Sequence, residues 1–187
     1  MTFGNNDCRY HDNAPPEAEK TEYYSFIHKL WFENHTPNKP FAAAAKETLL
    51  NGGYYRADIS SDVSILELNT MAYNTDALPE LIGQSAADQM KWLAKTLEEA
   101  TDRKFIILDH IYGGARFKHD NTKKAQSLWA PEYLDQYLKI WEQNSDKIMI
   151  ELAGHDHWED LRVTDNDATN HPSRNLFVSA GISPDHN

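Results

Sequence analysis

Three histidines lie where the sequence predicts the ends of buried strands. His155 and His157 follow a short apolar run at residues 148–152, and His110 follows another at residues 105–108. The ends of neighbouring strands in an α/β sheet converge at one edge, so the three imidazoles are expected to meet there. Imidazole nitrogen is a ligand for zinc and other divalent metals. The pattern favours a metal site, and a pair of surface histidines beside a turn is the alternative.

The spacing of His155 and His157, in a Gly-His-Asp-His segment, adds to this expectation. On extended backbone, residues two positions apart point to the same side, so the rings could serve two metal ions or share one. Asn5, in a Gly-Asn-Asn-Asp segment, supplies an amide oxygen, which is a hard ligand suited to divalent metals. Taken alone, Asn5 is more typical of a glycine-asparagine turn. The prediction of a metal site depends on Asn5 in combination with the three histidines.

The overall composition is that of an acidic, single-domain chain. With 187 residues, of which 40% are hydrophobic, the chain is long enough to bury one sizeable core. Its formal net charge of -11 is the opposite of what a nucleic-acid groove or an anionic membrane surface attracts. We expect neither a membrane span nor a signal peptide within it. The single cysteine, Cys8, cannot form a disulfide within the chain.

Helical and strand patterns alternate along the chain, which predicts an α/β fold. The first helix carries Tyr24, Ile27, Leu30 and Trp31 on one stripe. Residues 70–83 show neither period and are expected to form a loop near the strand ends. Helices are expected at residues 17–34, 41–50, 86–100 and 131–143, and strands at residues 54–59, 63–68, 105–108, 148–152, 161–163 and 176–178.

The order and spacing of several motifs resemble those of calcineurin-like metallophosphoesterases. The branch that the chain resembles is that of the acid sphingomyelinase-like phosphodiesterases and endopolyphosphatases. This resemblance implies part of a four-layer αββα sandwich, the C-terminal portion of the catalytic domain, with the N-terminal half missing. Residues 1–187 are therefore expected to be a single incomplete domain that is open at both ends. The motifs are Gly-Asn-Asn-Asp at residues 4–7, Ser-Ile-Leu-Glu-Leu-Asn-Thr at 64–70, Asp-Gln-Met-Lys-Trp-Leu at 88–93, Asp-His-Ile at 109–111 and Gly-His-Asp-His at 154–157.

The resemblance also implies which residues would bind metal. Asn5, His110 and His155 would ligate one divalent ion, and His157 would ligate the other. The remaining family ligands, an Asp-x-His pair and a bridging aspartate, lie on strands before the Gly-Asn segment. Zinc is the expected metal at both sites, with manganese, iron, cobalt or magnesium as alternatives. This chain would largely supply only one of the two sites.

The residue after the ligand asparagine is where many family members have a histidine that protonates the leaving group. Here that residue is Asn6, whose amide cannot act as a general acid. The endopolyphosphatase-like members resemble this chain in having Asn-Asn-Asp, so the change alone does not imply inactivity. His11 is the nearby substitute candidate, and a surface histidine in a Pro-flanked turn is the alternative interpretation.

Two functions are consistent with these residues. The first is a metal-dependent phosphoric ester hydrolase, a phosphodiesterase in which two metals activate a water that attacks phosphorus. Its substrate would be a small-molecule phosphate ester, a lipid head group or polyphosphate. The second is a non-catalytic relative, a binding or structural protein that keeps the fold with an incomplete metal site. For the isolated 187 residues we expect little or no turnover.

The resemblance carries an expectation about location as well. Family members of this branch are commonly secreted or lysosomal/vacuolar glycoproteins. An Asn-His-Thr sequon at Asn34 fits such a location. A pattern of three residues also arises by chance, so the sequon alone does not establish glycosylation.

Overall fold

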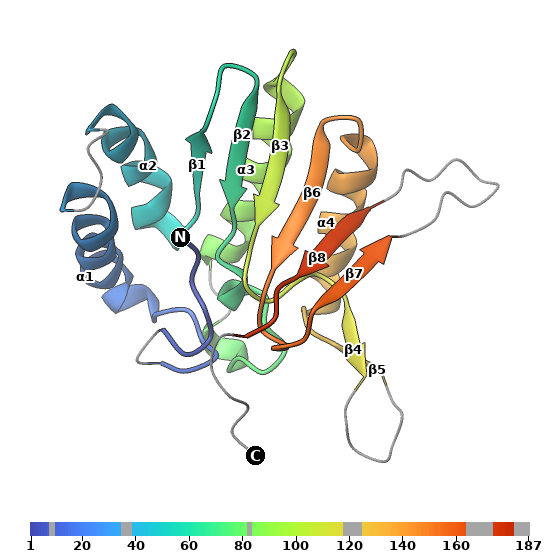
Figure 1. The fold of residues 1–187 in the computed structure, drawn as a ribbon. Helices are drawn as coiled ribbons and strands as arrows, with labels where there is room; N and C mark the ends of the chain where they lie inside the picture. The colour runs from blue at the N-terminus through green and yellow to red at the C-terminus, as the bar shows by residue number, and fades with distance from the viewer. Residues whose placement is uncertain (8–9, 35–38, 82–83, 118–124, 164–173, 182–187) are drawn as a thin grey trace.

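A computed structural model of the chain describes residues 1–7, 10–34, 39–81, 84–117, 125–163 and 174–181. These segments form a mixed sheet of six strands in the order β1-β2-β3-β6-β8-β7 (Figure 1). The neighbours β2, β3, β6 and β8 run parallel, whereas β1 and β7 are antiparallel strands at the two edges. The strands span Tyr55–Asp58 (β1), Val63–Glu67 (β2), Lys104–Leu108 (β3), Ile148–Ala153 (β6), Asp160–Val163 (β7) and Asn175–Val178 (β8).

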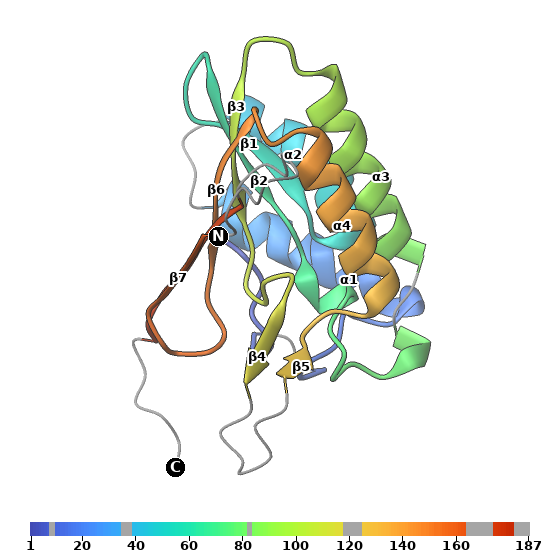
Figure 2. The same ribbon diagram turned by 90° about the vertical axis from the view of Figure 1, so that its right-hand side faces the viewer.

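Helices pack against one face of this sheet. Helices α3 (Gln84–Glu99) and α4 (Pro131–Gln143) lie side by side on that face, as Figure 2 shows. Helices α1 (Glu17–His28) and α2 (Lys39–Gly52) pack against each other, and α2 also contacts β1. The predicted α/β class is therefore confirmed. Across the described residues, no helix has both the length and the apolar character needed to span a bilayer.

The two faces of the sheet differ in how well they are buried. Leu66, Phe105 and Ile107 belong to the core that α3 and α4 cover, and they are fully buried. On the opposite face the alternate apolar residues Ile65, Ile106, Leu108, Leu152 and Phe177 are only partly buried. A continuous apolar face is rarely left to solvent by a monomeric protein. Across that face Ile65 pairs with Ile106, Leu108 with Leu152, and Leu152 with Phe177.

The first helix ends differently from the prediction. After His28 the chain continues as a π-helix, η1 (Lys29–Glu33), whose wider turn shifts which positions face inward. Phe32 is consequently 3% exposed, whereas Leu30, expected on the buried stripe, is 38% exposed. The expected core position of Leu30 is wrong because a constant period of 3.6 residues does not hold through this segment.

A second, two-stranded sheet has no counterpart among the predicted elements. Its strands β4 (Ala115–Phe117) and β5 (Ala125–Ser127) pair antiparallel, and each has three residues. So short a strand shows no clear alternation in sequence. The expected loop at residues 70–83 contains two short 3₁₀ helices, η2 (Thr70–Ala72) and η3 (Pro79–Leu81). These elements lie beyond the carboxyl ends of the parallel strands (Figure 1).

Glu67, the last residue of β2, is a carboxyl group buried without a strong partner. It is fully buried, and no described residue donates a well-formed hydrogen bond to either of its oxygens. Burial raises the pKa of Glu67 from its ordinary value of 4.5 to about 8, although Thr2, the N-terminal ammonium and the Phe3 backbone oppose the rise. Glu67 is therefore mostly protonated in the folded protein at neutral pH.

The free energy of unfolding should fall between about pH 5 and pH 8 in part because of Glu67. In this window the unfolded chain has lost the Glu67 proton while the folded chain keeps it, so rising pH favours unfolding. The variant Glu67→Gln keeps the shape and removes the ionisation, so the loss of stability across the window should shrink by about 3 kcal/mol. Urea unfolding at both pH values measures the difference. Glu98→Gln, at an exposed position of α3, is the control. Equal pH dependence in Glu67→Gln and the wild type would contradict the prediction.

Candidate metal centre

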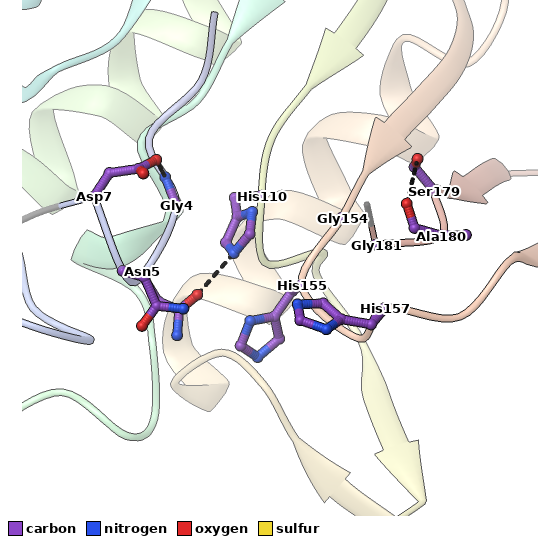
Figure 3. A pocket seen from close by; sticks show the side chains of 11 residues that line it. Gly4, Asn5, Asp7, His110, Gly154, His155, His157, Ser179, Ala180 and Gly181 are labelled. Atoms are coloured by element: carbon purple, nitrogen blue, oxygen red, sulfur yellow. Dashed lines mark hydrogen bonds between the residues drawn. The ribbon is translucent and has the colours of Figure 1, made fainter. Parts of the chain in front are cut away.

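The carboxyl ends of β3 and β6 meet the N-terminal loop at a pocket of about 640 Å³. His110 follows β3 and His155 follows β6, and these strands are parallel neighbours. Asn5 reaches the same place from the start of the chain, and His157 also borders it (Figure 3). All four predicted ligands therefore line one pocket, and their role as ligands stays a prediction. The lining residues are Gly4, Asn5, Asn6, Asp7, His110, Gly154, His155, His157, Ser179, Ala180 and Gly181.

Asn5 and His110 contact each other directly. The Oδ1 atom of Asn5 lies 2.8 Å from Nε2 of His110. The amide nitrogen of Asn5 donates to Oδ1 of Asp12 at 3.1 Å, which turns the amide oxygen toward the histidine. Gly4 permits this approach, because a Cβ atom there would lie 3.0 Å from Oδ2 of Asp7 and 3.3 Å from Cε1 of His110. An oxygen and a nitrogen donor thus face one another across a short gap.

His155 joins this pair from the end of β6. Its ring centre is 5.3 Å from that of His110, and the ring planes meet at 74°. Its Nδ1 atom is buried, and no described residue forms a hydrogen bond with it. Burial is the main cause that lowers the pKa of both histidines, that of His110 to about 4. Both rings are therefore neutral at pH 7, which is the form of imidazole that binds metal.

The two histidines of the Gly-His-Asp-His segment do not lie on extended backbone as expected. Both have left-handed conformations, with φ of 77° at His155 and 59° at His157. The Asp156 N–H donates at 3.0 Å to the carbonyl two residues before it, which closes the bend. His155 consequently contacts His110, whereas His157 packs on Gly181, where a Cβ atom would lie 2.8 Å from Cγ of His157. The expectation of extended backbone here is wrong, although both residues line the same pocket.

Asp156, between these histidines, anchors the bend. Its Oδ2 atom accepts a hydrogen bond of 2.6 Å from the Tyr112 hydroxyl, and Arg162 donates to the same hydroxyl oxygen at 2.9 Å. The Arg162 guanidinium also lies 4.6 Å from the centre of the Tyr112 ring. Burial raises the pKa of Tyr112, so the hydroxyl stays protonated and can donate. Sequence reasoning missed these supports because the contacts join residues 44 and 50 positions apart and no motif marks them.

The structure places the two candidates for proton transfer differently. Asn6 lines the pocket beside Asn5. His11 is not among the lining residues. Its side chain is 69% exposed, and its Nδ1 atom lies 2.6 Å from Oδ2 of Asp12. The catalytic roles of Asn6 and His11 stay predictions, and His11 would have to move to reach a substrate in this pocket.

The donor atoms that converge fit one cation site better than two. Within the described segments, no group of three or more histidine, cysteine, aspartate and glutamate side chains is arranged to hold a metal ion. The atoms that do converge are an amide oxygen and two imidazole nitrogens, from Asn5, His110 and His155. Such oxygen and nitrogen donors suit zinc and similar divalent ions. The partnerless Nδ1 of His155 marks a position that a cation would satisfy.

Curated relatives match most of the chain, whereas no family model matches it. Sphingomyelinase phosphodiesterase C from Dictyostelium discoideum is 30% identical over 147 residues, which cover 74% of this chain and 31% of that protein. Human cyclic GMP-AMP phosphodiesterase SMPDL3A is 26% identical over 187 residues, covering 97% of this chain and 38% of the relative. Human acid sphingomyelinase-like phosphodiesterase 3b is 25% identical with the same coverage.

A solved structure shares the fold. The structure of PhoD has a TM-score of 0.52 and 15% sequence identity, and the match covers 87% of this chain and 34% of that chain. The chain therefore has an α/β fold that this solved structure shares. In sequence, the chain is a homologue of the acid sphingomyelinase-like phosphodiesterases, as its motifs predict. It spans between 31% and 38% of the length of these relatives.

Proposed function

We propose that the protein is a metal-dependent phosphoric ester hydrolase of the phosphodiesterase type, and that this chain supplies part of its active site. The observation that carries the proposal is the convergence of Asn5, His110 and His155 at one pocket, where Nδ1 of His155 is buried without a partner. The curated relatives are named as phosphodiesterases, which supports hydrolysis of a phosphoric ester.

The atoms that would hold a divalent cation are Oδ1 of Asn5, Nε2 of His110 and Nδ1 of His155. Two such cations, zinc by preference and otherwise manganese, iron, cobalt or magnesium, would supply an activated water and offset the charge on the phosphoryl oxygens. His157 would hold the second cation. The chain keeps these donors oriented, because Asp12 fixes the amide of Asn5 and the bend at residues 154–157 fixes the histidines.

Asn6 would contact the substrate without protonating it. It lines the pocket next to Asn5, and its amide has two N–H donors but no proton to give up at neutral pH. These donors can bind a phosphoryl oxygen or the leaving oxygen. We therefore assign Asn6 a positioning role at the place where the family resemblance implies a histidine acid in many members.

A second layer is proposed to cover the sheet face opposite the helices. That face presents Ile106, Leu108, Leu152 and Phe177, which pair across strands and are only partly buried. Sheets that pack face to face bury such alternate residues between them. In the four-layer sandwich that the family resemblance implies, this layer would place the Asp-x-His ligands beside His157.

A non-catalytic role is the second candidate. The family resemblance implies a histidine acid in many members where this chain has Asn6, which favours this role. The described residues also hold no group of three histidine, cysteine or carboxylate ligands. In this case the pocket would bind a divalent ion or a phosphate ester without hydrolysing it.

We propose a phosphate ester as the substrate, whether a small molecule, a lipid head group or polyphosphate. The relatives' names mention sphingomyelinase and cyclic GMP-AMP, which places both lipid and nucleotide esters among the substrates to test. We further propose that the protein is a secreted or lysosomal/vacuolar glycoprotein. The exposure of Asn34, which begins the sequon, supports this proposal. The other sequon residues lie outside the described segments.

Hydrolysis of bis(p-nitrophenyl) phosphate with added zinc tests the proposed activity. The 187 residues alone should show little turnover, because they largely supply one cation site. A chimera in which the upstream segment of a curated relative precedes them should hydrolyse the ester, and His155→Ala should abolish that activity. A chimera that binds zinc without turnover would instead support the non-catalytic role. Measurable turnover by the 187 residues alone, lost in His155→Ala, would contradict a partial site.

A further inference from the structure

Arg116, on strand β4, is not among the residues that line the pocket, but it contacts His155, which is. Its Nη1 atom lies 3.4 Å from Nε2 of His155 and 3.3 Å from Oδ1 of Asp156. Its Nη2 atom lies 3.8 Å from Oδ2 of Asp76, and the side chain is 31% exposed. The proposed function gives this residue no task.

The contacts of Arg116 are long compared with those of the neighbouring arginines. Arg174 holds Glu151 at 2.6 Å, and Arg162 holds Asp160 at 2.7 Å. Both distances are typical of strong charge-assisted hydrogen bonds. Arg116 has no contact shorter than 3.3 Å among those the described residues make with it. Its guanidinium is therefore held less firmly than the other two and can turn toward another acceptor.

Arg116 forms ion pairs with Asp156 and Asp76, but both are long, at 3.3 and 3.8 Å. Asp156 already accepts the hydroxyl proton of Tyr112 on its Oδ2 atom, so only Oδ1 faces the arginine. The other neighbour is the imidazole of His155, whose Nε2 atom lies 3.4 Å from Nη1 of Arg116. A positive charge beside imidazoles that would hold a cation weakens that cation's binding. The position is better suited to an anion that enters the pocket.

The position of the proton on the His155 ring is a second reason to expect that Arg116 can bind another acceptor. A neutral imidazole carries one N–H, so Nε2 can accept a hydrogen bond from Arg116 only while Nδ1 holds the proton. Nδ1 is the buried atom that lacks a hydrogen-bond partner. If Nδ1 serves as a ligand, the proton lies on Nε2, which then no longer accepts from Arg116. In that state the Nη1 atom keeps Oδ1 of Asp156, 3.3 Å away, and loses its second acceptor.

We propose that Arg116 is a substrate-binding residue that takes the non-bridging oxygens of the phosphoryl group. This inference rests on the proposed function and adds the recognition of the anion to it. The planar guanidinium presents parallel N–H donors that match two oxygens of a phosphate, a geometry that a lysine cannot reproduce. Free phosphate and the phosphate of a lipid head group share this chemistry.

Calorimetric titration of the zinc-loaded chain with inorganic phosphate, and separately with phosphocholine, tests the role of Arg116. Arg116→Gln should weaken the binding of both anions by roughly tenfold or more, because a charge-assisted hydrogen bond is lost. Arg116→Lys keeps the charge but loses the parallel N–H donors of the guanidinium. Its affinity for both anions should lie between those of Arg116→Gln and the wild type. Arg56→Gln removes a surface arginine that pairs with Asp58 on β1, and it should bind both anions like the wild type.

Zinc titration of the same proteins separates this inference from the proposed function. Zinc affinity in Arg116→Gln should equal or exceed that of the wild type, because a repelling charge is removed. Failure of the wild type to bind zinc would overturn the proposed cation site and the inference together. With zinc bound, undiminished anion affinity in Arg116→Gln, or no anion binding by the wild type, would overturn only the role of Arg116. A loss confined to one of the two anions would also overturn it, because the shared phosphoryl group would not be the ligand.

Discussion

Replacing His110 by alanine should lower zinc affinity by at least about 100-fold, since even the indirect supports of a metal ligand contribute 10- to 100-fold. His110 is the centre of the converging donors: it contacts Asn5 at 2.8 Å and faces the ring of His155. The absence of a side chain at Gly4 leaves room for this ring, because a Cβ atom there would lie 3.3 Å from Cε1 of His110. Isothermal titration with zinc at pH 7, where the imidazoles are neutral, measures the effect.

Two further variants make the zinc experiment decisive. His11→Ala removes an exposed histidine outside the pocket and should leave zinc affinity unchanged. His155→Ala should repeat the loss seen in His110→Ala, and circular dichroism of each variant shows whether the fold is kept. If His110→Ala and His155→Ala bind zinc as tightly as the wild type while remaining folded, the cation does not bind at this pocket.

Leu93→Ala should reduce the free energy of unfolding by about 2 to 5 kcal/mol. Leu93 is 1% exposed on α3 and lies in the core between Met90 and Leu97, so truncation leaves a cavity under the helix. Leu138→Ala, on α4, is the matched control because that leucine is 41% exposed. Urea unfolding of the three proteins gives the comparison. A loss below about 1 kcal/mol in Leu93→Ala, equal to that of the control, would show that this face of α3 is not core.

Regular segments with strong periodicity could be predicted from sequence. Helix α4 spans Pro131–Gln143, as its proline at the start and its apolar stripe indicate. Strand β8 begins one residue before the predicted range and ends with it. The π-turn after His28 could not be foreseen, because it is a change of period that tertiary packing of Phe32 stabilises. The β4–β5 hairpin was missed because its strands are too short to carry a pattern.

The candidate site was predictable to the extent that strand ends determine it. His110 and His155 follow parallel neighbours, so strand assignment alone brings them together. The left-handed backbone of His155 could not be inferred, since non-glycine residues rarely adopt it and no glycine marks the position. Arg116 carried no signal either, because its neighbour His155 is 39 positions away and the hairpin that places it was not recognised.

The distance along the chain between the pocket residues has a consequence for folding. Asn5 and His110 touch although 105 positions separate them. Closing so long a loop costs entropy that only the finished parallel sheet repays, and high contact order slows folding. The pocket should therefore assemble late, as one of the last products of the folding reaction. A ligand that binds there recognises only the completed topology, so it would raise the unfolding free energy of the whole six-stranded sheet rather than of one loop.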